Sequence, residues 1–157
     1  IAWLWIMYRH AKSYDAFMTS RLEPIHVNAS IDFHDDWHMY FKGFDNAGKT
    51  FRWSARKHTA LIFRLEPPAT IPLDVCMHGR LLDGVTVDAT ADGKALPIVM
   101  DAGRRSVCMR LDPSPRPDNP YRIKLRFHNT PPPRPNDWRL FGIALTSVTI
   151  DAAHEHR

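Results

Sequence analysis

Carboxylates and imidazoles alternate in one short run of this sequence, which is the place best suited to metal chemistry. The run consists of Asp32, His34, Asp35, Asp36, Trp37 and His38. Two or three such oxygen and nitrogen ligands could hold a divalent ion. Asp side chains also accept hydrogen bonds from N–H groups in turns, so the run is equally typical of a polar loop that leads into a strand. A metal site would need distant ligands that the sequence does not identify, so we expect the loop and no metal. A small metal-dependent enzyme built on this run remains a third functional alternative.

The common signatures of catalytic and nucleotide-binding sites are missing from the chain. It contains no G-x-S-x-G elbow, P-loop, G-x-G-x-x-G or H-E-x-x-H motif. A second polar cluster, His154, Glu155 and His156, lies where we expect a frayed tail over residues 153–157. The net charge is +4 and both signs are mixed along the chain, which indicates no nucleic-acid partner. We therefore expect a domain that has neither catalysis nor a cofactor of its own.

Large aromatic residues are concentrated between positions 37 and 53. They are Trp37, Tyr40, Phe41, Phe44, Phe51 and Trp53. An exposed aromatic plane can cover the apolar C–H face of a sugar ring, while a few polar side chains bind its hydroxyls. Trp37, Tyr40 and Trp53 could form such a platform, with Arg52 as a polar contact. The alternative is that the domain buries these rings in its core.

Three cations alternate with apolar residues near the end of the chain. Arg122, Lys124 and Arg126 share one face of an expected strand over residues 121–127, a basic ladder about 14 Å long at ~3.4 Å per residue. The ladder could bind acidic sugars, phosphate-bearing glycans or anionic lipid headgroups. The alternative is that these cations discourage aggregation of the sheet.

The period of the hydrophobic pattern changes after Pro24. Residues 1–22 contain many helix-forming side chains and no Pro or Gly, so they predict a helix. Apolar residues then alternate with polar ones in short segments separated by Asp-Gly and similar turns, which is typical of antiparallel strands in a β-sandwich or barrel. The expected strands lie in residues 59–65, 71–78, 85–89, 107–111, 121–127, 143–145 and 148–150. We expect an N-terminal helical segment over residues 1–24 and one all-β antiparallel sandwich domain over residues 25–152.

The helical segment opens with eight apolar or aromatic residues, followed by Arg9, His10 and Lys12. Eight residues are too few to span a bilayer, which takes roughly twenty. Two interpretations stay open: the end of a truncated transmembrane helix, or an amphipathic helix that packs Trp3, Ile6, Met7 and His10 on its own domain.

Two cysteines, Cys76 and Cys108, lie in expected strands on the face opposite the apolar neighbours. Their spacing fits no zinc site with cysteine ligands. They are either two free thiols or a cross-strand disulfide.

The segment before the last strand has polar residues at a spacing that predicts a structural role. Asp137 and Arg139 are two apart, so on one strand face they can pair. Gly142 permits a bulge or a close backbone approach as the chain enters the last strand.

Two motifs together resemble a known family. They are Phe51-Arg52-Trp53-Ser54 and, after Thr130-Pro131-Pro132-Pro133, the segment from Asp137 to Leu145. Over roughly residues 45–150 the chain resembles the galactose-binding-like jelly-roll modules found at the C-terminal end of bacterial membrane glycosyltransferases and phosphoglycerol-transferase-like enzymes. It departs from their pattern at Lys49 and Thr50, where an acidic residue is usual, and at Phe141, where Leu is usual.

The resemblance implies a jelly-roll sandwich and a non-catalytic, glycan-binding accessory module of a membrane-bound transferase. It also implies the bacterial cell envelope, on the periplasmic side of the inner membrane, whereas the two cations Arg9 and Lys12 would favour the cytoplasmic side. The expected partner is a glycan, with membrane contact through the N-terminal segment. The alternative function is a protein-interaction or scaffolding domain without sugar binding.

Overall fold

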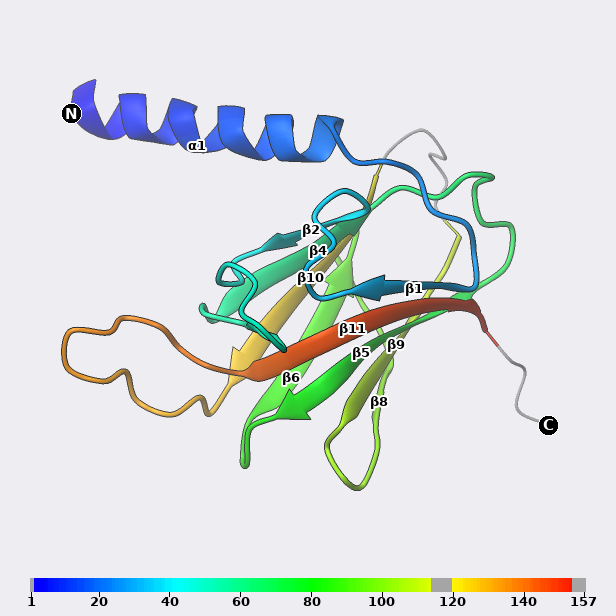
Figure 1. The fold of residues 1–157 in the computed structure, drawn as a ribbon. Helices are drawn as coiled ribbons and strands as arrows, with labels where there is room; N and C mark the ends of the chain where they lie inside the picture. The colour runs from blue at the N-terminus through cyan, green and yellow to red at the C-terminus, as the bar shows by residue number, and fades with distance from the viewer. Residues whose placement is uncertain (1, 114–119, 154–157) are drawn as a thin grey trace.

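The N-terminal helix forms from residues that favour helix and ends before Pro24. The computed structural model describes residues 2–113 and 120–153. Helix α1 spans Ala2–Ser20 and extends away from the two sheets (Figure 1). Every residue of α1 before Asp15 is exposed, and only Met18 and Thr19 are buried. Within the described residues, no helix combines the length and the apolar character that crossing a membrane requires.

Eleven strands of the described chain form two sheets in which each neighbouring pair is antiparallel. The first sheet has the order β1-β11-β5-β9-β8, with β3 paired to β11, and the second has the order β2-β4-β10-β6-β7. The strands are β1 (Ala29–Asp32), β2 (Met39–Lys42), β3 (Arg52–Trp53), β4 (His58–Phe63), β5 (Leu73–Leu81), β6 (Thr86–Ala91), β7 (Lys94–Ala95), β8 (Ile98–Met100), β9 (Ser106–Leu111), β10 (Tyr121–His128) and β11 (Ile143–Ala152).

The core lies between the two sheets, because alternate residues of the long strands point inward. In β10 the buried residues Ile123, Leu125 and Phe127 alternate with exposed cations, and β5 and β9 show the same period of two. One cluster of buried side chains joins both sheets. The predicted all-β antiparallel sandwich behind an N-terminal helix is thus confirmed.

A smaller cluster fastens the end of α1 to the outer face of the second sheet. Met18 and the following Leu22 pack with Tyr40, Ala60 and Ile62. This contact buries the side of β2 and β4 that would otherwise face water. The interpretation in which Trp3, Ile6, Met7 and His10 pack on the domain is wrong, because all four are exposed.

The last strand differs from the prediction of two short segments. β11 is continuous, with an irregularity in its pairing to β5 between Leu145 and Ser147. Gly79 of β5 lies opposite this point with a φ of 151°, and a Cβ there would lie 1.9 Å from the carbonyl oxygen of Ala144. Only glycine lets the two strands approach this closely.

Cys76 and Cys108 form a disulfide between β5 and β9. They are direct partners in the strand register, with their Cα atoms 4.0 Å apart. Both are half-buried on the outer side of the first sheet, as their sequence neighbours point into the core. Of the two alternatives for these cysteines, the cross-strand disulfide is the one that the structure contains.

Candidate functional site

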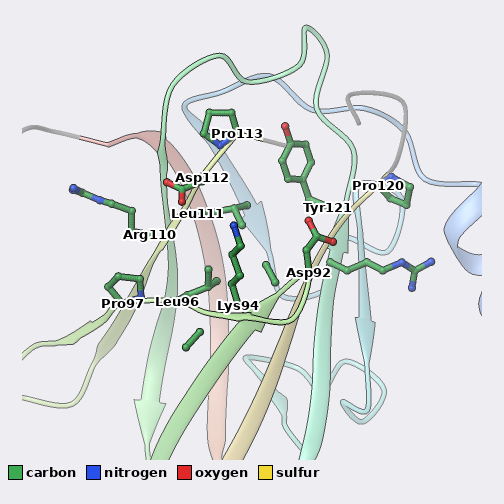
Figure 2. A pocket seen from close by; sticks show the side chains of 13 residues that line it. Asp92, Lys94, Leu96, Pro97, Arg110, Leu111, Asp112, Pro113, Pro120 and Tyr121 are labelled. Atoms are coloured by element: carbon green, nitrogen blue, oxygen red, sulfur yellow. The ribbon is translucent and has the colours of Figure 1, made fainter. Parts of the chain in front are cut away.

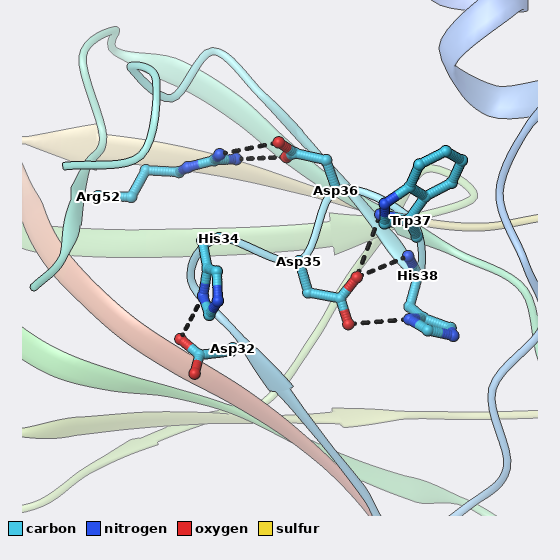
Figure 3. A network of polar contacts seen from close by, with 7 residues as sticks. All are labelled: Asp32, His34, Asp35, Asp36, Trp37, His38 and Arg52. Atoms are coloured by element: carbon cyan, nitrogen blue, oxygen red, sulfur yellow. Dashed lines mark hydrogen bonds and ion pairs between the residues drawn. The ribbon is translucent and has the colours of Figure 1, made fainter. Parts of the chain in front are cut away.

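The acidic and histidine-rich run forms the loop between β1 and β2. Asp35 Oδ1 accepts hydrogen bonds from the backbone N–H groups of Trp37 (3.1 Å) and His38 (3.2 Å), and its Oδ2 lies 2.8 Å from His38 Nδ1. Figure 3 shows these contacts closing the loop on itself. The interpretation of Asp as a turn acceptor ahead of a strand is confirmed.

The other acidic and histidine side chains of this loop contact different partners. Asp36 binds the Arg52 guanidinium at 3.0 and 3.3 Å, whereas His34 lies 3.1 Å from Asp32 (Figure 3). Across residues 2–113 and 120–153, no three His, Cys, Asp or Glu side chains are grouped closely enough to hold a metal ion.

Arg52, expected as a polar contact for a sugar, is buried. Its side chain is 6% exposed, its guanidinium lies 4.6 Å from the centre of the Phe41 ring, and Asp36 neutralises it. A buried cation needs such a partner, because burying an unpaired charge is costly. This residue therefore ties the β1–β2 loop to β3.

The three aromatic residues Trp37, Tyr40 and Trp53 do not form one exposed platform. Tyr40 is 8% exposed, and its hydroxyl donates to Asp15 at 2.7 Å. Burial and the Asp15 carboxylate both raise the pKa of the Tyr40 hydroxyl. The half-buried Trp53 packs against Phe51, so Trp37, which is 62% exposed, is the member that presents its ring to solvent.

Arg122, Lys124 and Arg126 lie where the sequence places them, on the outer face of the second sheet. In the part of the chain that the structure describes, none of the three has a carboxylate within 4.0 Å; Asp88, which lies opposite Arg126, is paired with His128 at 2.7 Å. Strand β10 has β4 on one side and β6 on the other. Its cations therefore do not protect an open edge of the sheet. None of the three forms an ion pair within the described residues, and the Arg122 guanidinium is close enough to the Asp15 carboxylate to help lower its pKa.

A hollow of about 630 Å³ lies at the end of the sandwich where β10 finishes and β4 begins. It is lined by Asp45, Ala55, Arg56, Lys57, His58, Trp138, Arg139 and Leu140. Trp138 is 91% exposed, more than any other large apolar side chain among the described residues. The hollow thus combines an open aromatic ring with cations and a carboxylate.

Arg139 fixes the loop that carries this ring. Its guanidinium donates to both oxygens of Asp137 at 2.9 and 2.7 Å and to Asp45 at 2.7 Å. The hydrogen bonds from the Arg139 side chain and backbone lower the pKa of Asp137 to about 2. The backbone N–H of Leu140 donates to the carbonyl of Ala55 at 2.9 Å, so the loop is also held to the chain just before β4.

The predicted pairing of Asp137 with Arg139 is confirmed, but their placement on a strand face is wrong. Both residues precede β11, which begins at Ile143. Asn136 has a φ of 63°, and Asp137 Oδ1 also accepts the Arg139 backbone N–H at 3.1 Å. A residue in the left-handed region, followed by an Asp whose carboxylate accepts the N–H two residues later, forms a turn ahead of β11.

Gly142 makes the close approach that its position predicts. The N–H groups of Gly142 and Ile143 donate to Ser54 Oγ at 3.1 and 2.8 Å. A Cβ on Gly142 would lie 2.5 Å from the Phe127 ring. The two sequence motifs, one ending at Ser54 and the other containing Gly142, are therefore hydrogen-bonded to each other in the structure.

Sequence reasoning missed Trp138 as a candidate contact. The usable signal was its place in a segment that begins with a run of prolines and has no alternating apolar residues, so nothing there directs a large ring into the core. Lys57 and His58, which line the same hollow, are distant from Trp138 in the sequence, so no local pattern links the three residues.

A second hollow lies at the opposite end of β10, where Figure 2 shows Asp92, Lys94 and Asp112 around it. Pro113 and Pro120, which line it, flank residues 114–119 in the sequence, and because those lie outside the described residues we assign no site there. His154, Glu155 and His156 also lie outside the described residues.

Comparison with known proteins does not assign the chain to a family. No protein-family model matches the chain, and no curated protein sequence is significantly similar to it.

Proposed function

We propose that this chain is a non-catalytic glycan-binding module that stacks a sugar ring on Trp138. The observation that carries the proposal is that Trp138, which is 91% exposed, lines one hollow together with Asp45, Lys57 and His58. The flat ring can cover the apolar face of a sugar, and the neighbouring charged groups can bind its hydroxyls.

The loop of Trp138 is held before any ligand arrives. Arg139 makes three side-chain hydrogen bonds to two carboxylates, and Leu140 adds a backbone bond to Ala55. A side chain whose backbone is already fixed loses less conformational entropy on binding. The fixed backbone of this loop therefore supports a role for Trp138 in ligand binding.

The charge around the hollow favours an acidic glycan. His58 lines the hollow and lies directly opposite Arg126 in the second sheet. From there Lys124 and Arg122 continue the line of cations along β10. A glycan that carries carboxylate or phosphate groups could stack one ring on Trp138 and extend its charges along this ladder.

The wider setting that we propose is a jelly-roll, galactose-binding-like accessory domain of a membrane-bound glycosyltransferase or a related surface-polysaccharide enzyme. It would act in the bacterial cell envelope, on the periplasmic side of the inner membrane. The disulfide supports an oxidising compartment, because disulfides persist outside the reducing cytosol.

The test is a titration of the whole chain with neutral, carboxylate-bearing and phosphate-bearing oligosaccharides, followed by the indole N–H signals in NMR spectra. We expect millimolar acidic glycan to shift the Trp138 signal. Trp138→Ala should abolish binding, whereas Trp37→Ala, which removes another exposed Trp, should leave it unchanged. Arg126→Gln should weaken the binding of acidic glycans more than the binding of neutral ones.

No response to any glycan, or a response that survives Trp138→Ala, would overturn the proposal. The second candidate function is a protein-interaction domain, favoured by the same exposed Trp138. It predicts that Trp138→Ala disrupts assembly with a partner enzyme while no sugar affinity is measurable.

A further inference from the structure

The first part of α1 exposes apolar side chains on every side of the helix. Trp3, Leu4, Trp5, Ile6, Met7 and Tyr8 are each more than half exposed. Successive residues of a helix are rotated by about 100°, so six in a row surround the whole axis. An ordinary surface helix instead has one apolar stripe and one polar face.

The sandwich does not cover this segment. The ring contact of Tyr14 with Tyr40 and the Asp15 hydrogen bonds hold the other end of α1 to the second sheet. Residues 2–8 therefore stand clear of the domain, as Figure 1 shows for the start of the helix. With a rise of 1.5 Å per residue, they form an apolar cylinder about 10 Å long.

Two cations mark the end of this apolar segment. The Arg9 guanidinium lies 4.7 Å from the centre of the Trp5 ring, and the Lys12 ammonium lies 4.9 Å from that of Tyr8. Aromatic rings of this kind favour the boundary between lipid tails and headgroups, and nearby cations bind the phosphates. The segment thus combines aliphatic side chains with three aromatic rings, and two cations follow it along the helix.

We propose that residues 2–8 of α1 insert into the surface layer of a bilayer that contains anionic phospholipid, with Arg9 and Lys12 at the headgroup phosphates. At 1.5 Å per residue, residues 2–8 account for about 10 Å of the inserted helix, compared with a hydrocarbon core roughly 30 Å thick. This proposal does not depend on glycan binding, because it uses none of the residues around Trp138 or on β10.

A bilayer fits this segment better than a second copy of the chain does. Two helices that pair bury one stripe each and leave their opposite faces in water. Here the opposite face would still expose bulky apolar side chains. A lipid environment surrounds the helix on all sides, and anionic headgroups complement the charges of Arg9 and Lys12.

The test is flotation of the full chain with vesicles of phosphatidylcholine alone or of phosphatidylcholine mixed with phosphatidylglycerol. We expect binding to the mixed vesicles, weakened by high salt because salt screens the headgroup charges. Leu4→Glu/Ile6→Glu should weaken binding at least about tenfold. Arg9→Gln and Lys12→Gln should each weaken it roughly fivefold. The matched control is Ile71→Glu/Val99→Glu, which adds the same two charges at exposed apolar residues outside α1 and should leave binding unchanged.

A second measurement locates the inserted segment. Lipids brominated on their tails should quench the tryptophan fluorescence of the bound protein. Trp3→Phe/Trp5→Phe should still float with the vesicles but lose this quenching, because it keeps the segment apolar and removes the reporters.

The proposal is overturned if the chain does not bind the mixed vesicles, or if Leu4→Glu/Ile6→Glu binds as well as the parent. It is also overturned if the parent protein forms a dimer in solution that does not bind vesicles, and if Leu4→Glu/Ile6→Glu dissociates this dimer.

Discussion

Reduction of the disulfide between Cys76 and Cys108 should destabilise the sandwich while leaving its native structure intact. The two residues lie opposite each other in β5 and β9, which are already joined by their strand pairing. Their sequence neighbours, Val75, Met77 and Val107 among them, are fully buried in the core. Since the folded state has these other contacts, the bond acts mainly by restricting the unfolded chain.

The size of the effect follows from the length of the closed loop. The cysteines are 32 residues apart. Loop-closure entropy for this length corresponds to ~3.7 kcal/mol of free energy of unfolding at 25 °C. In a domain of this size ~1 kcal/mol shifts the melting temperature by about 2–4 °C, so reduction should lower it by about 7–15 °C.

The assay is thermal and urea unfolding, followed by circular dichroism with and without a phosphine reductant. The control is Cys76→Ser/Cys108→Ser. Its melting temperature should equal that of the reduced parent protein and should not change when the reductant is added. Its urea dependence should be steeper than that of the oxidised parent, because the unfolded chain without the bond exposes more surface.

Two results would refute this reasoning. Thiol titration of the denatured, unreduced protein could find two free thiols, in which case the bond does not exist. A melting temperature that reduction leaves unchanged within about 2 °C would show that the bond does not restrict the unfolded chain as proposed.

Three further predictions concern the elements that position the sites. Gly142→Ala should lower the free energy of unfolding by about 1–3 kcal/mol, because the new Cβ would overlap the Phe127 ring; urea unfolding measures this, and equal stability would contradict it. The pKa of Asp137 is lowered to about 2, so its ion pair should persist from neutral pH downward and be lost only as the pH falls through about 2. A carboxyl NMR titration with a midpoint near the ordinary 3.8 would disprove this. Asp15→Ala removes the acceptor of the Tyr40 hydroxyl and should speed amide hydrogen exchange at the end of α1, with the sandwich still folded. Exchange as slow as in the parent would show that this contact does not fasten the helix.

The long strands could be predicted because their pattern is local. In β10, Ile123, Leu125 and Phe127 alternate with charged residues, and in β9 the buried Val107 and Met109 alternate with half-buried residues. One face of each strand meets the core and the other meets water, so the period of two is written directly in the sequence.

The short strands near the N-terminus could not be predicted in this way. In β2 the residues Met39, Tyr40 and Phe41 are all buried, so no alternation appears. The reason is tertiary: Met18 and Leu22 cover the outer side of this sheet, which makes both faces of β2 and β4 apolar.

The sequence also could not predict which of the candidate ligand-contacting residues are exposed to solvent. A charged Arg52 would be expected at the surface and a large apolar Trp138 in the core, yet Arg52 is buried beside Asp36 and Trp138 is almost fully exposed. The difference comes from partners that are distant in sequence, namely Asp36 for the first and the Arg139–Asp45 ion pair for the second loop.

The amino-acid sequence alone determined the helix, the antiparallel strands, the outward direction of the β10 cations and the shared face of the two cysteines, because helix propensity and a period of two act over a few neighbouring residues. Only the tertiary structure decided that the cysteines meet, that β10 is a central strand and that Trp138 lines a hollow with residues near the start of β4. Those features depend on strand order and on contacts between distant segments, and no local pattern of side chains encodes which strand lies beside which.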